Sequence, residues 1–446
     1  MSSDDNNNKI QNFRKVTIMT TGSRGDIQPF VAIGIAFKKA GYAVRILTQP
    51  SLTHATLLDD FGLEHVPFGI DVERFMMEDE ECRKAMETGD TLKFFKCIGS
   101  SIENDTASAC KPFVDEFVTE GGEHRPDLLV VSYLNRYFGL YAKHVLKIPT
   151  IEIKLQHWVF DDPSRAPMGM PTLPLGMHKL IQTKVMVPMD YKIFQRLDNC
   201  IADIIALEKH TKSETTSSSD DESSIICLDD FLLYDQLFES EVNHSPLLPM
   251  LVAQSPFFKD VLHHTLPSSQ NLRFVGPAVI EKKDQIEGNT QSFGDDSERR
   301  KIQEFIASNV ERKPVYMGWG SMIRKSTQGM TIFAVESLMM SNKRGIILGG
   351  SAGLSMATLE DAVAAGNATN DDDGKRIIEY AKANVIFVDK VPHEWLFPQV
   401  SLTVHHGGAG TLNGENNTTV YFFLTVVQII DVFSDESNCF GFFVCA

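Results

Sequence analysis

VTIMTTGSRGDIQP, residues 16–29, joins an apolar run to a glycine-rich turn. The run Val16–Met19 has the composition of a buried strand. Gly22 and Gly25 permit the positive φ that a sharp strand-to-helix turn often needs. Pro29 is tolerated in the first turn of a helix, where its missing N–H costs nothing. The stretch therefore predicts a strand, a tight turn carrying Asp26, and a helix.

A second stretch near the C-terminus, SLTVHHGGAGT (residues 401–411), has the same design. Its small residues, Gly407–Gly410, let the backbone approach a diphosphate closely, and a following helix N-terminus supplies free N–H groups. Thr411 can cap that helix and donate its hydroxyl, and His406 can donate to phosphate oxygens. Since α/β folds bind ligands at the carboxyl ends of their strands, both stretches are predicted to face a ligand.

Strands and helices alternate around these two stretches. Helical patterns cover Pro29–Ala40 and Ser51–Phe61, and apolar runs predict further strands at Tyr42–Thr48, His65–Phe68, Leu128–Ser132, Thr150–Leu155, Pro314–Met317, Gly345–Leu348 and Asn384–Val388. This rhythm predicts an α/β fold with parallel, doubly wound sheets. We expect two Rossmann-like domains facing across a cleft, the second one incomplete.

The predicted organisation is a disordered tail at residues 1–14, a first domain at 15–277, a linker at 278–300 and a second domain at 301–446. The low-complexity segment at 212–224 predicts a disordered insertion. Pro, Met and Gly between Trp158 and Pro188 predict a mobile apolar loop over a cleft. Asp371–Gly374 is also predicted to be a loop.

Composition narrows the function. The 446 residues carry 42 Lys and Arg against 59 Asp and Glu, giving a net charge of −17. An acidic chain without a basic cluster argues against a nucleic-acid partner and against a polybasic membrane patch. The seven scattered cysteines and the polar N-terminus predict reduced thiols and no signal peptide. We therefore expect a cytoplasmic protein with at most transient contact at a membrane surface. The sequence predicts no oligomeric state.

Asp26 has two interpretations from the residues alone. Asp at a helix start commonly accepts backbone N–H bonds, which is a purely structural role. A carboxylate at the mouth of a sheet can also act as a general base. Position in the chain does not decide between the two.

The turn GSRGD, followed by Ile27-Gln28-Pro29, resembles the corresponding loop of the GT-B glycosyltransferases, and within them the sterol and antibiotic glucosyltransferase group. The stretch Val391–Pro398 with the glycines after His406 resembles the group's nucleotide-sugar signature. Gly318–Met322 resembles its GxGS loop, although a strand ending in such a sequence can also be a plain βα turn. Taken alone, Trp395 and Phe397 are better explained by core packing.

The resemblance implies UDP-glucose as co-substrate and a sterol or other lipophilic alcohol as acceptor, with no metal and no cofactor. It implies that Asp26 is the base that deprotonates the acceptor hydroxyl, and that Trp158 lies at the acceptor. It places the donor on Ser23, Arg24, Ser321, Val391, His406, Gly408, Ala409, Gly410, Thr411, Asp435 and Glu436.

The resemblance weakens after Thr411. Asp435-Glu436 takes the place of an Asp-Gln pair, and the closing helices of the group are absent, so we expect a truncated second domain. A catalytically inactive UDP-sugar or lipid binder is therefore an alternative to the transferase, and a UDP-sugar epimerase on the same fold is a weaker one. His263-His264 and the acidic clusters at 220–222 and 371–373 lack ligand spacing for a metal. The glycines do not complete a dinucleotide fingerprint, so NAD is not indicated.

Overall fold

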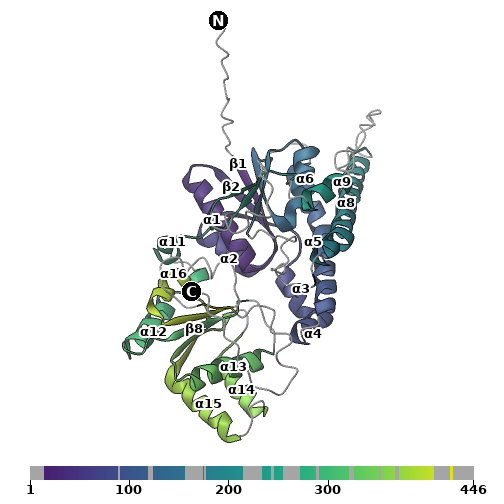
Figure 1. The fold of residues 1–446 in the computed structure, drawn as a ribbon. Helices are drawn as coiled ribbons and strands as arrows, with labels where there is room; N and C mark the ends of the chain where they lie inside the picture. The colour runs from purple at the N-terminus through teal and green to yellow at the C-terminus, as the bar shows by residue number, and fades with distance from the viewer. Residues whose placement is uncertain are drawn as a thin grey trace.

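The computed structural model describes residues 15–88, 91–118, 124–155, 174, 177–213, 234–242, 246–254, 272–287, 291–320, 326–350, 353–366, 371–405 and 422–424. Within these ranges the chain forms two parallel sheets covered by helices (Figure 1). The predicted α/β class with two parallel sheets is confirmed.

The first sheet has the order β3-β2-β1-β4-β5-β6-β7, and every neighbouring pair is parallel. Its order reverses between β1 and β4, which is the switch point of a doubly wound sheet. The strands are β1 (Lys15–Met19), β2 (Ala43–Thr48), β3 (Glu64–Pro67), β4 (Leu128–Ser132), β5 (Thr150–Lys154), β6 (Met250–Val252) and β7 (Leu272–Phe274).

Strand alternation divides the core of this sheet between its two faces. Ile18 and Ile46 pack under α1 (Arg24–Lys39) and α2 (Leu52–Asp60), while Met19 and Leu47 pack on the other face. That second face is covered by a larger helical layer (Figure 1). The remaining helices of this part are α3 (Val72–Glu78), α4 (Glu80–Thr88), α5 (Thr91–Phe117), α6 (Arg136–His144), α7 (Met177–Ile181), α8 (Val187–Ser213) and α9 (Tyr234–Val242).

The second sheet has the order β10-β9-β8-β11-β12, again all parallel, and it reverses between β8 and β11. Its strands are β8 (Val315–Gly318), β9 (Gly345–Leu348), β10 (Val385–Val388), β11 (Leu402–His405) and β12 (Phe422–Leu424). One face packs against α13 (Thr327–Met340), α14 (Met356–Ala364) and α15 (Asp371–Asn384), and the other against α12 (Asp296–Ala307) and α16 (His393–Leu396).

The segment predicted as a linker is partly helical. It contains α11 (Lys282–Glu287) and the 3₁₀ turn η4 (Gln291–Phe293), and it enters α12 at Asp296. The first sheet ends at Phe274 and the second begins at Val315. The predicted tail at 1–14 lies outside the described residues. So does most of the predicted insertion at 212–224, although α8 extends to Ser213.

One predicted loop is wrong, and a second is wrong in part. Asp371–Gly374 forms the first turn of α15, where acidic side chains interact favourably with the helix N-terminus. The predicted loop 158–188 is helical from Met177 onward, and its first part, residues 158–173 with 175 and 176, lies outside the described residues. A π-helical segment, η2 (Gln182–Met186), ends two residues before Pro188. The wider turn accommodates the proline, which cannot donate a backbone hydrogen bond.

One smaller difference concerns where a helix begins. Helix α1 starts at Arg24 rather than near Pro29, so the proline lies inside the helix instead of in its first turn. Strand β12 covers Phe422–Leu424, and residues 425–446 lie outside the described residues. In the part of the chain that the structure describes, no helix is long and apolar enough to span a membrane.

Candidate active site at the two switch points

The predicted site motifs follow the strands at which the two sheets reverse their order. The Gly22 turn leaves β1 in the first sheet. In the second sheet, Gly320 follows β8 and His406 follows β11 in the chain. Ligands of open α/β sheets bind outside the carboxyl ends of strands at such points. The topology therefore gives both motifs the place that a binding site requires.

The turn after β1 requires a glycine at its first position. Gly22 has φ +130°, and a Cβ atom there would lie 2.5 Å from Oδ2 of Asp26. The backbone N–H of Gly22 donates to Oε1 of Gln49 at 3.1 Å, which holds the turn against the end of β2. Any side chain at position 22 would therefore displace the carboxylate of Asp26.

Asp26 lies in the first turn of α1, where it also has a structural role. Ser23 is the N-cap residue, and its N–H and hydroxyl donate to Oδ2 of Asp26 at 2.8 and 2.9 Å. The structure gives Oδ1 of Asp26 no hydrogen bond to any residue it describes. The two interpretations of Asp26 are thus compatible: one carboxylate oxygen closes the helix start and the other can accept a proton.

Electrostatics favour a base at this position. Burial raises the pKa of Asp26 above its ordinary value, and the two hydrogen bonds from Ser23 offset part of the rise. A carboxylate whose pKa is raised toward the working pH is a more effective general base than an ordinary surface aspartate.

Further polar residues at the strand ends support the turn, and the sequence interpretation missed them. Asn135, just after β4, donates from Nδ2 to Oγ1 of Thr21 at 3.1 Å, and the Ser132 hydroxyl donates to Oδ1 of Asn135 at 2.8 Å. These contacts tie the ends of β1 and β4 together at the switch point. The available signal was the polar residues at or near the ends of these apolar strands, as in Thr48-Gln49.

His54 is a second residue that sequence reasoning missed. It lies in α2, is fully buried, and neither ring nitrogen has a hydrogen-bond partner in the described part of the chain. Burial lowers its pKa to about 4, against an opposing influence of Asp71. The imidazole is therefore neutral near pH 7.

Arg24, predicted to bind the donor, points its guanidinium at the segment between the sheets. Its Nη2 donates to the carbonyl of Ser292 at 2.7 Å, and its Cζ lies 5.1 Å from the ring centroid of Phe293. Its Nε donates to Oε1 of Gln28 at 3.4 Å. The contacts found for Arg24 thus include two residues of the predicted linker.

The two motifs of the second sheet that were predicted to bind the donor begin at neighbouring strands. His405 of β11 is paired in register with Gly318 of β8, and Gly320 has φ +59°, as a turn after a strand requires. Several predicted donor residues, with the predicted acceptor residue Trp158, lie outside the described residues: Ser321, His406, Gly408, Ala409, Gly410, Thr411, Asp435 and Glu436.

Val391 follows β10 and its side chain is buried in the core of the second sheet. Close by, the His393 ring stacks on Phe397 with centroids 4.8 Å apart, and its Nε2 is 2.9 Å from the hydroxyl of Tyr316. Phe397 is fully buried and Trp395 packs against the same cluster, which confirms the core-packing interpretation of both.

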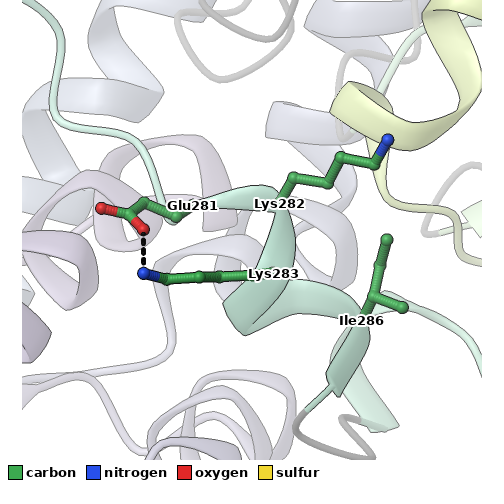
Figure 2. Close-up of a pocket in the computed structure, with 4 residues that line it drawn as sticks. All are labelled: Glu281, Lys282, Lys283 and Ile286. Atoms are coloured by element: carbon green, nitrogen blue, oxygen red, sulfur yellow. Dashed lines mark ion pairs between the residues drawn. The ribbon is translucent and has the colours of Figure 1, made fainter.

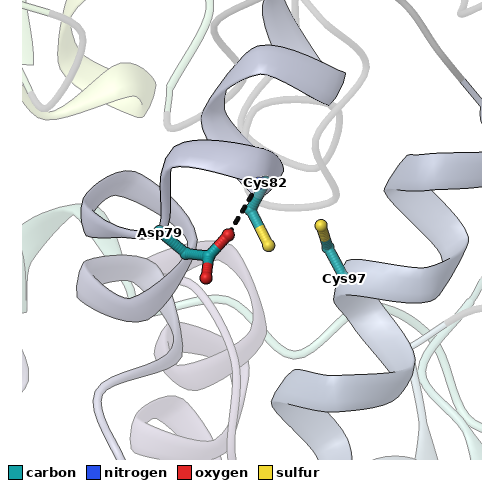
Figure 3. A group of neighbouring side chains, drawn as sticks. All are labelled: Asp79, Cys82 and Cys97. Atoms are coloured by element: carbon teal, nitrogen blue, oxygen red, sulfur yellow. Dashed lines mark hydrogen bonds between the residues drawn. The ribbon is translucent and has the colours of Figure 1, made fainter.

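Three side chains outside this region could in principle hold a metal ion. Asp79, Cys82 and Cys97 have ligand atoms within 4.8 Å of one another (Figure 3). Oδ1 of Asp79 accepts the N–H of Cys82 at 2.8 Å, and burial raises the pKa of the Cys82 thiol well above its ordinary value. Asp79 thus caps the start of α4, and both thiols are buried, so helix capping and packing account for this group.

A hollow of about 460 Å³ lies beside α11 and is lined by Glu281, Lys282, Lys283 and Ile286 (Figure 2). Nζ of Lys283 pairs with Glu281 at 2.9 Å. None of the predicted site residues lines it.

The two parallel sheets, each with its own switch point, have the architecture expected for the GT-B type of fold. More particularly, residues 16–115, which include β1 and the Asp26 turn, match the Glycosyltransferase family 28 N-terminal domain. Residues 16–115 are thus similar to this family 28 domain, and the resemblance seen in the sequence is confirmed.

Relatives with curated descriptions match most of this chain at modest identity. The UDP-sugar-dependent glycosyltransferase 52 of Dictyostelium discoideum is 25% identical over 89% of the chain, and the sterol 3-beta-glucosyltransferase of Saccharomyces cerevisiae is 23% identical over 89%. A sterol 3-beta-glucosyltransferase of Arabidopsis thaliana is also 23% identical over 89%. The chain spans only 21%, 28% and 52% of the lengths of these three proteins.

Solved structures share the fold. Arabidopsis thaliana UGT89C1 complexed with UDP superposes with a TM-score of 0.52 at 14% identity, covering 92% of this chain and 79% of that one. The glycotransferase of kitacinnamycin gives 0.51 at 15% identity, covering 94% and 82%.

Proposed function

We propose that this protein is an inverting glycosyltransferase that moves glucose from UDP-glucose to the hydroxyl of a sterol or another lipophilic acceptor. The observation that carries the proposal is the carboxylate of Asp26 at the switch point of the first sheet, with Oδ2 held by Ser23 and Oδ1 available. The sterol glucosyltransferases among the relatives support the acceptor class, and UDP bound to a protein of the same fold supports the donor.

In the proposed reaction the acceptor oxygen attacks the anomeric carbon while Oδ1 of Asp26 takes its proton. The bond between that carbon and the phosphate oxygen breaks, and UDP leaves with the negative charge. Ser321, His406 and the Gly408–Thr411 turn are proposed to hold the diphosphate, because N–H groups at a helix start stabilise a departing anion. The backbone at Val391 is proposed to contact the nucleobase of UDP. Asp435 and Glu436 are proposed to bind the hydroxyls of the sugar.

Three further features complete the proposal. Trp158 lies at the acceptor, and the reaction uses no metal and no cofactor. The protein acts in the cytoplasm, with transient contact at the membrane surfaces where lipophilic alcohols reside.

The test is UDP release by the purified chain supplied with UDP-glucose, with and without a sterol, next to the variant Asp26→Asn. Sterol-dependent release that the variant abolishes supports the transferase, and NMR of the product should show inverted anomeric configuration. UDP binding without release, in folded protein, would support the inactive binder instead. UDP-glucose consumption without any acceptor would support an epimerase.

A further inference from the structure

A four-residue turn, 291–294, lies between the Asp26 turn and the loop that precedes Val391. On one side Nη2 of Arg24 donates to the carbonyl of Ser292 at 2.7 Å. On the other side Nζ of Lys390 donates to the carbonyl of Gln291 at 3.1 Å. Arg24 is two positions before Asp26, the proposed catalytic base. Lys390 is one position before Val391, which is proposed to contact the nucleobase of the donor. Both motifs therefore hold the same short turn.

The contacts to the first sheet are specific. Asp60, the last residue of α2, accepts the N–H groups of Gln291 and Ser292 at 3.0 and 2.8 Å. Phe293 is buried in the core under α1, with its ring edge-on to Phe61 and centroids 6.4 Å apart. The guanidinium of Arg24 contacts this ring while it donates to the neighbouring carbonyl. An arginine can do both at once, because its N–H donors lie in the plane of the guanidinium group and the face of that group is free to stack on a ring.

The contacts to the second sheet are equally close. A Cβ on Gly294, whose φ is +82°, would lie 2.7 Å from the carbonyl oxygen of Lys390. Oε1 of Glu298 accepts the N–H of Asp389 at 2.7 Å. The turn therefore packs directly against the 389–390 backbone, and position 294 has no room for a side chain.

We propose that Arg24 is a positioning residue that fixes the 291–294 turn, and through it the spacing between Asp26 and the 389–391 loop, and that it is not a ligand of the donor. This assignment rests on the proposed function for its catalytic consequence. Its structural part, that Arg24 holds the turn, stands on the contacts alone.

The test compares Arg24→Ala and Arg24→Lys with Arg312→Ala. Arg312 is a matched control, because its Nη2 also donates to a backbone carbonyl, that of Asn342, at 2.7 Å. Asn342 belongs neither to the 291–294 turn nor to the Asp26 motif. Hydrogen exchange at the amides of Gln291 and Ser292 reports whether the turn is held. We expect Arg24→Ala to accelerate this exchange about tenfold, as loss of a hydrogen bond from a charged donor predicts, and Arg312→Ala to leave it unchanged.

Two functional readouts separate positioning from donor binding. If Arg24 is a positioning residue, Arg24→Ala should lower kcat about tenfold or more, while the Kd for UDP should stay within about twofold of wild type. It also predicts that Arg24→Lys does not restore kcat, since an ammonium cannot stack and donate as a planar fork does. If Arg24 instead binds the phosphates of the donor, Arg24→Ala should weaken UDP binding about tenfold, and Arg24→Lys should largely restore it.

Unchanged exchange at Gln291 and Ser292 in Arg24→Ala overturns the proposal, and so does weakened UDP binding that lysine restores. If the wild-type chain transfers no glucose, the proposed function fails. The exchange comparison still decides whether Arg24 holds the turn.

Discussion

Both hydrogen bonds that Ser23 donates to Asp26 end on the same carboxylate oxygen, Oδ2, from the N–H at 2.8 Å and from the hydroxyl at 2.9 Å. The arrangement fixes the carboxylate without using its second oxygen. It also allows the helix-closing role of Asp26 and its proposed role as the catalytic base to be separated by substitution.

Asp26→Asn should abolish transfer and leave the fold intact. An amide oxygen can replace Oδ2 as the acceptor from Ser23, whereas the amide cannot take a proton at neutral pH. Asp26→Ala removes the acceptor as well and should lower the free energy of unfolding by about 1 kcal/mol relative to Asn, as loss of a helix-start hydrogen bond predicts. Chemical denaturation and UDP release measure the two effects. Residual turnover in the Asn variant above about 1% of wild type would argue against Asp26 as the base.

Ser23→Ala should shift the pH dependence of the reaction. The Ser23 hydroxyl lowers the pKa of Asp26, so its loss raises that pKa, and the acidic limb of kcat/KM should move to higher pH. Ser326→Ala is the matched control. Ser326 caps α13 by accepting the N–H of Gly329 at 3.1 Å, so its loss should cost a similar stability of about 1 kcal/mol. An equal shift of the limb in both variants would show that general destabilisation is the cause.

Glu394→Gln should remove a pH dependence of stability. Burial raises the pKa of Glu394 to about 7, and its Oε2 accepts from Nε2 of Gln285. Between pH 4.5 and 7 the folded state therefore binds more protons than the unfolded state, so the free energy of unfolding falls as the pH rises. Because the group is partly exposed, the loss is on the order of 1 kcal/mol. Denaturant unfolding at pH 5 and pH 8 should show it in the wild type, and an identical loss in the variant would contradict this origin.

His54 should make the protein acid-sensitive. Its pKa is lowered by burial from 6.5 to about 4, so between these values the unfolded state binds the proton and the folded state does not. Stability is thus lost as the pH falls through this window, by about 3 kcal/mol at most. His54→Leu removes two buried nitrogens without partners and should flatten the dependence between pH 7 and pH 4. A variant as acid-sensitive as the wild type would assign the effect to other groups.

Local pattern was sufficient for most of the sheet architecture. Leu128–Ser132 and Gly345–Leu348 are strands with the predicted bounds, because a continuous apolar run between turn signals has few alternatives in a parallel sheet. The predictions failed where one local signal was given too much weight. The Pro, Met and Gly content of 158–188 suggested a loop, but the chain is helical from Met177 and passes Pro188 within α8. Asp371–Asp373 suggested a solvated loop, whereas the charges favour a helix start.

The site was predictable only as far as its contacts are local. Ser23 and Asp26 lie within one turn, so the motif contains their relationship. Arg24 contacts Ser292 across 268 positions, and nothing near Arg24 in the sequence indicates that partner. His54 likewise has no motif around it. Its burial arises from the packing of α2 on the first sheet, which a single sequence does not display.

The pairing of His405 with Gly318 constrains how this scaffold can be recombined with its relatives. The two glycine motifs of the second sheet start from neighbouring strands, so their offset is set by one ladder of backbone hydrogen bonds. A slip of one residue would turn the fully buried His405 to the opposite face. Chimeras that exchange parts of the second sheet between this chain and a relative should therefore take β8 and β11 together from the same parent protein.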